Sequence, residues 1–244
     1  MNMVRIIDVH GHLSKFWLPM PWKNSDIIKY LDKFGIEKFV ASSLLSICEN
    51  FVEGNKETSR FVREYPGRVY GYVVVNPHYL RESLTEIEKY SKIDGFVGIK
   101  IHDGYYMQIE PLTSPVWREI WRSIADLGWA VLCHDSLASI AKIAPEYPDV
   151  PFISAHATNL TYAVKYAKEE YRPNIFLEIC GTARRYGIIE ALVETLGSAD
   201  NIIFGTDLPL LSPASSIGKV MNAEIPEKEK EKILYKNALR IFQF

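Results

Sequence analysis

The sequence contains few cysteines, and their placement limits what they can do. Cys48, Cys133 and Cys180 are an odd number, lie far apart and include no Cys-x-x-Cys pair. A disulfide framework or a cysteine-based zinc module needs paired, regularly spaced cysteines. The pattern is therefore typical of reduced thiols in the cytosol.

Long apolar runs are also missing from the chain. No uninterrupted apolar stretch approaches the roughly 20 residues that a membrane-spanning helix requires. The N-terminus lacks the basic segment and the following apolar segment of a secretory signal. We therefore expect a cytoplasmic protein without a membrane partner.

Neither sign of charge dominates the sequence. The 28 lysines and arginines nearly balance the 30 aspartates and glutamates, which leaves a net charge of -2 at pH 7. Proteins that bind nucleic acids or anionic membranes usually carry a basic excess. The charge balance gives no support to nucleic acid as a partner.

The most regular feature of the 244 residues, 48% of which are hydrophobic, is a series of short apolar runs. The runs are rich in β-branched and aromatic residues, as strands buried on both faces should be. There are eight of them, at residues 4–9, 38–43, 69–75, 96–101, 130–134, 151–155, 174–179 and 201–205.

Amphipathic helical patterns lie between these runs, and the pattern that ends before Gly197 has the glycine typical of a helix C-cap. Eight strands alternating with helices predict an α/β fold, a single (β/α)8 TIM barrel over residues 1–244. An open doubly wound sheet is the rival fold. It would usually carry a glycine-rich first turn, whereas Gly11 stands alone between two histidines.

Polar side chains gather at the ends of the predicted strands, where a barrel of this kind places its chemistry. Every histidine of the chain lies at or just past such an end. The six are His10, His12, His78, His102, His134 and His156. Random placement would put some of them elsewhere, so the clustering predicts a functional site.

The pair His10 and His12 is the strongest single signal. Side chains two residues apart on a strand project to the same side. Two neutral imidazoles side by side pack poorly in an apolar core but are good ligands for a divalent transition metal. The pair therefore predicts a metal site.

Several motifs follow one another in a recognisable order. They are Asp8-x-His10-x-His12, Gly98-x-Lys100-x-His102, the later His134 and His156, Gly-Thr-Asp-x-Pro at 205–209, and the closing segment 237–242. In this order the motifs resemble the amidohydrolase superfamily, most closely its amidohydrolase-2 branch of metal-dependent hydrolases, lactonases and decarboxylases. The resemblance implies a TIM barrel with a metal site at the C-terminal ends of the strands.

The resemblance also implies roles for individual residues. His10, His12, His134 and Asp207 would hold one divalent metal ion, with zinc favoured over manganese or iron. Asp207 would act as general base and take a proton from water on the metal. His156 would orient or protonate the substrate, or would join a second metal ion.

Three positions keep alternative interpretations. His134 is followed by Asp135, and strand parity leaves open which of the two faces the barrel. Lys100 is expected inside the barrel, hydrogen-bonded to a carboxylate such as Glu178. In some members of the superfamily the equivalent lysine is carboxylated and bridges two metal ions. For Cys180 the expectation is a small buried hydrophobic residue.

Candidate substrate contacts lie around this site. His102 shares the strand parity of Lys100 and could touch the substrate. Arg184 could clamp a substrate carboxylate, or could begin a solvated helix. The loops that contain Trp17 and Tyr105 are apolar, and such loops usually cover either a substrate pocket or a second subunit, so a homodimer stays open.

The expected function is a metal-dependent hydrolase that cleaves an amide, ester or lactone bond in a small molecule. A non-oxidative decarboxylase with the same metal ligands is the nearest rival. A phosphoesterase of the TatD type would have a glutamate ligand where this chain has Lys100 and His102. A metal-binding barrel without catalysis is the last alternative, and the presence of Asp207 counts against it.

Overall fold

Eight parallel strands form one sheet, in which each strand pairs with the next along the chain. The computed structural model describes residues 4–13, 23–102, 111–157, 160–181 and 187–244. The strands are β1 (Ile6–Leu13), β2 (Ile36–Ser43), β3 (Val69–Val74), β4 (Phe96–His102), β5 (Ala130–His134), β6 (Phe152–Ser154), β7 (Ile175–Glu178) and β8 (Ile202–Ile203).

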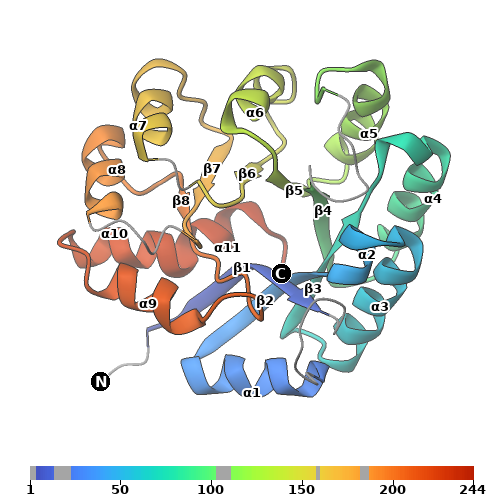
Figure 1. The fold of residues 1–244 in the computed structure, drawn as a ribbon, viewed down its shortest axis with the longest axis horizontal. Helices are drawn as coiled ribbons and strands as arrows, with labels where there is room; N and C mark the ends of the chain where they lie inside the picture. The colour runs from blue at the N-terminus through green and yellow to red at the C-terminus, as the bar shows by residue number, and fades with distance from the viewer. Residues whose placement is uncertain (1–3, 14–22, 103–110, 158–159, 182–186) are drawn as a thin grey trace.

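Helices alternate with the strands and surround them in chain order, as Figure 1 shows. They are α1 (Asn24–Phe34), α2 (Leu44–Cys48), α3 (Phe51–Glu64), α4 (Leu80–Tyr90), α5 (Pro115–Ala125), α6 (Leu137–Ile143), α7 (Leu160–Glu169), α8 (Ile188–Leu196), α9 (Pro213–Met221), α10 (Glu227–Glu231) and α11 (Asn237–Ile241). The described residues also include two short 3-10 helices, η1 (Pro77–Tyr79) and η2 (Ala144–Glu146), and the π-helical stretch η4 (Lys232–Lys236). The arrangement confirms the predicted (β/α)8 TIM barrel.

All eight predicted apolar runs overlap a strand, and the largest difference concerns the first. The run was expected at residues 4–9, whereas β1 continues to Leu13. Pairing with β2 extends that far, and the backbone N–H of His12 donates to the carbonyl of Leu208 at 2.7 Å. His10 and His12 therefore lie within the strand, where hydrogen bonds on both sides fix their backbone.

Side chains of the strands alternate between two apolar clusters. On β5, Ala130 and Leu132 belong to an inner cluster enclosed by the strands, whereas Val131 and Cys133 belong to an outer cluster under the helices. This alternation is the period of two that any strand imposes. The inner cluster fills the barrel, so chemistry is confined to its ends.

The ring of strands closes between β1 and the segment that follows β8. The amide of Val9 donates to the carbonyl of Phe204 at 3.1 Å, and the amide of Asp207 donates to the carbonyl of His10 at 2.7 Å. The buried carboxylate of Asp8 accepts from the amide and the hydroxyl of Thr206. Closure therefore holds residues from the two ends of the sequence at fixed separation.

The C-terminal segment packs against the inner cluster. Ala238 and Phe242 are buried in it, and the ring of Phe242 lies 6.2 Å from that of Tyr72. The buried side chain of Asn237 donates to the carbonyls of Ala199 and Ile202, each at 2.7 Å. These bonds attach α11 to the start of the last strand.

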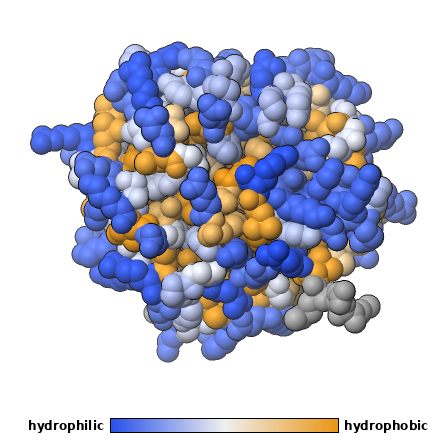
Figure 2. Space-filling model, turned by 180° about the vertical axis from the view of Figure 1, so that it is seen from behind, coloured by the Kyte–Doolittle hydropathy of each residue, from blue (hydrophilic) through white to orange (hydrophobic). Residues whose placement is uncertain are grey.

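The face of the molecule turned away from the viewer in Figure 1 is largely polar at its outline, with apolar side chains in patches between (Figure 2). Glu227 and Lys228 of α10 are exposed, whereas Glu229 of the same helix is buried and accepts from the amide of Ala199. Among the described residues, no helix combines the length and the apolar character needed to cross a bilayer.

Replacing Asn237 with Ala should lower the free energy of unfolding by about 2 kcal/mol or more, because two hydrogen bonds are lost from a buried site. The matched control is Asn222→Ala, since Asn222 is exposed and bonds only to the carbonyl of Gly218 one turn earlier. The control should change the free energy by no more than about 0.5 kcal/mol. Equal effects of the two substitutions in urea unfolding would contradict the anchoring role of Asn237.

Candidate metal centre

His10 and His12 project from β1 and are both buried. The residue between them must be glycine, because a Cβ at Gly11 would lie 1.9 Å from Cζ of Phe39. The pairing of β1 with β2 is irregular between Asp8 and Gly11. The two imidazoles nevertheless share one side of the strand, with ring centroids 5.3 Å apart.

The hydrogen bonds of the two rings define which nitrogen of each is a free acceptor. Nδ1 of His10 lies 2.9 Å from Oε2 of Glu178, and a carboxylate can only accept, so this nitrogen carries the proton. Nδ1 of His12 lies 3.3 Å from the carbonyl oxygen of Ser42, which has the same consequence. In a neutral ring the Nε2 lone pair is then available, the tautomer that binds a metal.

Asp207 brings a third acceptor to the same point. Its Oδ1 lies 3.0 Å from Nε2 of His12 and 3.5 Å from Nε2 of His10. This oxygen is buried and makes no regular hydrogen bond among the described residues. Three potential ligand atoms thus lie close together, an arrangement that a cation would stabilise. The residues present fit a divalent metal ion.

Two residues at this point have a strained backbone. His156 has a φ of 51° and Asp207 a φ of 60°, in the left-handed region that side chains other than glycine rarely adopt. Each such residue costs about 1–3 kcal/mol and persists only where the surroundings enforce it. Here the amide of His156 donates to Glu178 at 3.1 Å, and the amide of Asp207 donates to His10.

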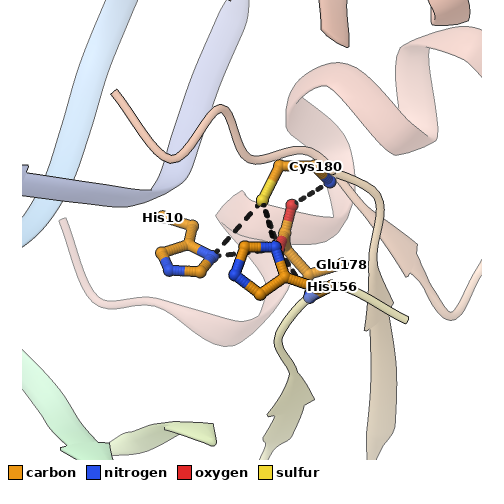
Figure 3. Close-up of side chains that lie close together, drawn as sticks. All are labelled: His10, His156, Glu178 and Cys180. Atoms are coloured by element: carbon orange, nitrogen blue, oxygen red, sulfur yellow. Dashed lines mark hydrogen bonds and ion pairs between the residues drawn. The ribbon is translucent and has the colours of Figure 1, made fainter. Parts of the chain in front are cut away.

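Glu178 connects the polar side chains on the Nδ1 side of His10 (Figure 3). It is fully buried and accepts from the ring of His10 and from the amides of His156 and Cys180. The thiol of Cys180 donates to Oε2 of Glu178 at 3.0 Å. A carboxylate in this position orients the ligand histidine and fixes its tautomer.

Cys180 was expected to be a small buried hydrophobic residue, and the structure corrects this interpretation. The residue is buried, but its Sγ lies 3.0 Å from Nδ1 of His156 and 3.6 Å from Nδ1 of His10. The sequence did contain a signal for this position. Phe176, Glu178 and Cys180 are spaced by two, and Phe176 belongs to the inner cluster, so the alternation of the strand places Cys180 on the same side as Glu178.

Burial sets the protonation of the site. It lowers the pKa of His10 well below the usual value, and the charge of Lys100 lowers it further. Burial alone would raise the pKa of Asp207, but the imidazoles of His12 and His10 beside the carboxylate outweigh this effect and hold that pKa below its usual range. Burial raises the pKa of the Cys180 thiol well above normal. The centre therefore combines a neutral His10 with an ionised carboxylate.

Lys100 lies inside the barrel as expected, but its contact differs from the prediction. Its Nζ lies 3.1 Å from Nε2 of His10, where a bond to Glu178 was expected. Glu178 instead accepts from His10, His156 and Cys180. Burial lowers the pKa of Lys100.

His134 and His102 lie at the edge of this centre. Their rings stack with centroids 4.1 Å apart, and the ring of His134 meets that of His156 edge-on at 4.9 Å. His134 lies two residues after Leu132, which belongs to the inner cluster, so strand alternation places both side chains on the same face of β5. The predicted substrate contacts Trp17, Tyr105 and Arg184 lie outside the described residues.

Comparison with known proteins gives one family and one fold. A family model described as amidohydrolase matches residues 47–244. No curated protein matches the sequence.

Solved structures with the same fold include both decarboxylases and a hydrolase. 5-Carboxyvanillate decarboxylase from Sphingomonas paucimobilis has 13% identity and a TM-score of 0.78, covering 98% of this chain and 99% of that one. Dihydroxybenzoic acid decarboxylase from Polaromonas sp., with bound manganese and the inhibitor 2-nitroresorcinol, has 18% identity and a TM-score of 0.75, covering 99% and 97%. A probable 2-pyrone-4,6-dicarboxylic acid hydrolase from Acinetobacter baumannii has 18% identity and a TM-score of 0.73, covering 98% and 99%.

A methyl group at Gly205 should disrupt the centre. Its Cβ would lie 2.5 Å from Oε1 of Glu178 and 2.8 Å from Cβ of His10, so both side chains would have to move. Gly205→Ala should lower the free energy of unfolding of the metal-free protein by about 1–3 kcal/mol, the range for overpacking.

The matched control is Gly218→Ala on α9, where nothing lies within 4 Å of the added carbon. That change should be neutral or stabilising by up to about 1 kcal/mol, because alanine favours a helix over glycine. Urea unfolding measures both variants. If Gly205→Ala were as stable as Gly218→Ala, the close packing of Glu178 and His10 against Gly205 would be wrong.

Proposed function

The chain belongs to the amidohydrolase family, and we propose that it is a metal-dependent hydrolase that cleaves an amide, ester or lactone bond of a small molecule. The observation that carries the proposal is the convergence of His10 Nε2, His12 Nε2 and Asp207 Oδ1 on one point. Nitrogen and oxygen donors of this kind suit zinc, manganese or iron.

Four residues hold the ion in this proposal. His10, His12 and Asp207 supply the converging atoms, and His134 completes the set from the neighbouring edge. Zinc is favoured, with one ion rather than two. When bound, the ion lowers the pKa of water and polarises a carbonyl group.

Asp207 and His156 move the protons in the proposed reaction. Oδ2 of Asp207 lies 3.8 Å from Nε2 of His156. An approach of these two side chains by about 0.6–1 Å would let a proton taken up by the carboxylate pass to the imidazole. The side chain of His156 is 23% exposed, which places it where the leaving group would depart. Glu178 keeps His10 in the ligand tautomer, and His102 lies where a substrate could contact it.

A non-oxidative decarboxylase is the second candidate. The observation in its favour is that decarboxylases of 5-carboxyvanillate and of dihydroxybenzoates share this fold over nearly their whole length. The same ligands would bind a substrate carboxylate, and Asp207 or His156 would deliver a proton to carbon. Phenolic carboxylic acids are therefore the class of substrate to test for this reaction.

Three further features complete the proposal. We propose that residues 1–244 act as one domain, that the protein is cytoplasmic, and that the apolar loops around Trp17 and Tyr105 contact either the substrate or a second subunit. The small number and wide spacing of the cysteines support the location.

Metal content tests the ligand assignment. Protein purified without chelator should contain about one transition-metal ion per chain, and His12→Ala should lose most of it, because ligand removal weakens binding strongly. His12 is the suitable target since its other nitrogen contacts only Ser42 among the described bonds. The control is His78→Ala, since His78 is exposed and lies in η1, which follows β3. Unchanged metal content in His12→Ala would overturn the assignment.

Isotopic labelling of the products separates the two reactions. Turnover of lactones, esters or amides in oxygen-labelled water should place solvent oxygen in the product, whereas decarboxylation in heavy water should place deuterium on carbon and release carbon dioxide. Asp207→Asn should lower kcat by about 10²–10⁴-fold, the usual contribution of general acid–base catalysis. Wild-type turnover in Asp207→Asn would refute its role in proton transfer.

A further inference from the structure

A second group of potential ligands lies on the opposite side of His10 from Asp207 and His12. We propose that His10, His156, Glu178 and Cys180 form a second metal site, which takes a thiophilic divalent ion such as zinc or cadmium. The four side chains come from β1, from the end of β6 and from the end of β7, and they point toward one another in Figure 3. The inference does not depend on the proposed function, because neither Asp207 nor His12 is among its ligands.

The geometry of this group is close to that of a metal site. One ligand atom from each residue lies within 4.8 Å of all the others. Sγ of Cys180 is 3.0 Å from Nδ1 of His156 and 3.6 Å from Nδ1 of His10, and the latter is 2.9 Å from Oε2 of Glu178. Ligand atoms around tetrahedral zinc are about 3.3–3.7 Å apart, given bond lengths of about 2.0–2.3 Å. The contacts of Cys180 Sγ with His156 and Glu178, at 3.0 Å each, and the 2.9 Å contact of His10 with Glu178 would have to lengthen by about 0.3–0.7 Å to reach this range.

The chemistry of the donors favours a soft ion. A thiolate, two imidazole nitrogens and one carboxylate oxygen are a typical set for zinc, and the sulfur discriminates against manganese and magnesium. The proton that Cys180 now donates to Glu178 occupies the place between the ligands. When the metal–sulfur bond forms, this proton leaves to solvent and the ion takes its place.

Burial distinguishes this site from a catalytic Cys-His pair. Cys180 and Glu178 are fully buried, so the sulfur is not available to attack a substrate. His156 is the partly exposed member of the group and offers a path of entry for an ion. A buried thiol beside a carboxylate and two imidazole nitrogens is better suited to hold a cation than to act as a nucleophile.

His10 belongs to both ligand groups, and this sharing makes the two sites alternatives. A neutral imidazole has one lone pair, which points through Nε2 to Asp207 and His12 or through Nδ1 to Cys180. Occupation of the second site requires the other tautomer, in which the Nε2 proton faces Asp207 Oδ1 at 3.5 Å. A thiophilic ion in the second site would therefore withdraw His10 from the first.

Cadmium binding to the chelator-treated full chain tests the proposal. The sequence has three cysteines, so Cys48→Ser/Cys133→Ala leaves Cys180 alone. In this background, titration with cadmium should produce the ultraviolet charge-transfer band of a cadmium–thiolate bond, saturating at about one ion per chain. Far-ultraviolet circular dichroism confirms that the background variant is folded. Absence of the band would overturn the proposal.

Three further substitutions in the same background define the ligands. His156→Ala should weaken cadmium binding by at least about 10-fold, whereas His78→Ala should leave it unchanged. His12→Ala should keep the band, because His12 serves only the first site. Unchanged affinity in His156→Ala, or loss of the band in His12→Ala, would contradict a separate second site. Failure of the proposed function would instead appear as absence of metal from the His12 and Asp207 group, with this band retained.

Discussion

Closure of the barrel between its first and last strands is the constraint on which the site depends. The two histidines of β1 and Asp207 are separated by nearly the whole sequence, yet their ligand atoms lie 3.0–3.5 Å apart. The separation is fixed by backbone bonds from Val9 and Asp207 across the seam and by the buried carboxylate of Asp8, which accepts from Thr206. Burial raises the pKa of Asp8 to about 8, although the hydrogen bonds from Thr206 and His10 oppose the rise. The buried carboxylate of Asp8 does not destabilise this junction, because each of its oxygens accepts a hydrogen bond.

Closure also brings the potential ligand atoms of His10, His12 and Asp207 together. Glu178 accepts from His10 and thereby turns the lone pair of the ring toward Asp207. The carboxylate of Asp207 lies beside the imidazole nitrogens of His10 and His12, and one of its oxygens makes no regular hydrogen bond among the described residues. The left-handed backbone of Asp207 and His156 adds conformational strain at the same point. Proteins usually accept such costs where a ligand compensates for them, and a divalent cation compensates for all the converging lone pairs at once.

The periodicity of the sequence predicted the fold, because the alternation of strands and helices and the facing of side chains within a strand both depend on residues that are near one another in the chain. Apolar runs separated by amphipathic helices identify strands buried on both faces, and the spacing of two between His10 and His12 places both on one side. What periodicity does not contain is the distance between side chains of different strands. The sequence therefore identified Lys100 and Glu178 as residues of the interior but paired them with each other, whereas each contacts His10. For the same reason Cys180 was interpreted as a packing residue, since its neighbours come from β1 and β6.

The most direct test of the account is the position of a bound ion. A crystal of the chelator-treated protein soaked in manganese, which avoids thiolate ligands, should show an anomalous-scattering peak at about 2.0–2.2 Å from Nε2 of His10, Nε2 of His12 and Oδ1 of Asp207. Glu178 should still accept from the other nitrogen of His10. A peak elsewhere, or no peak between these three atoms at saturating manganese, would contradict the claim that closure of the barrel builds a metal centre.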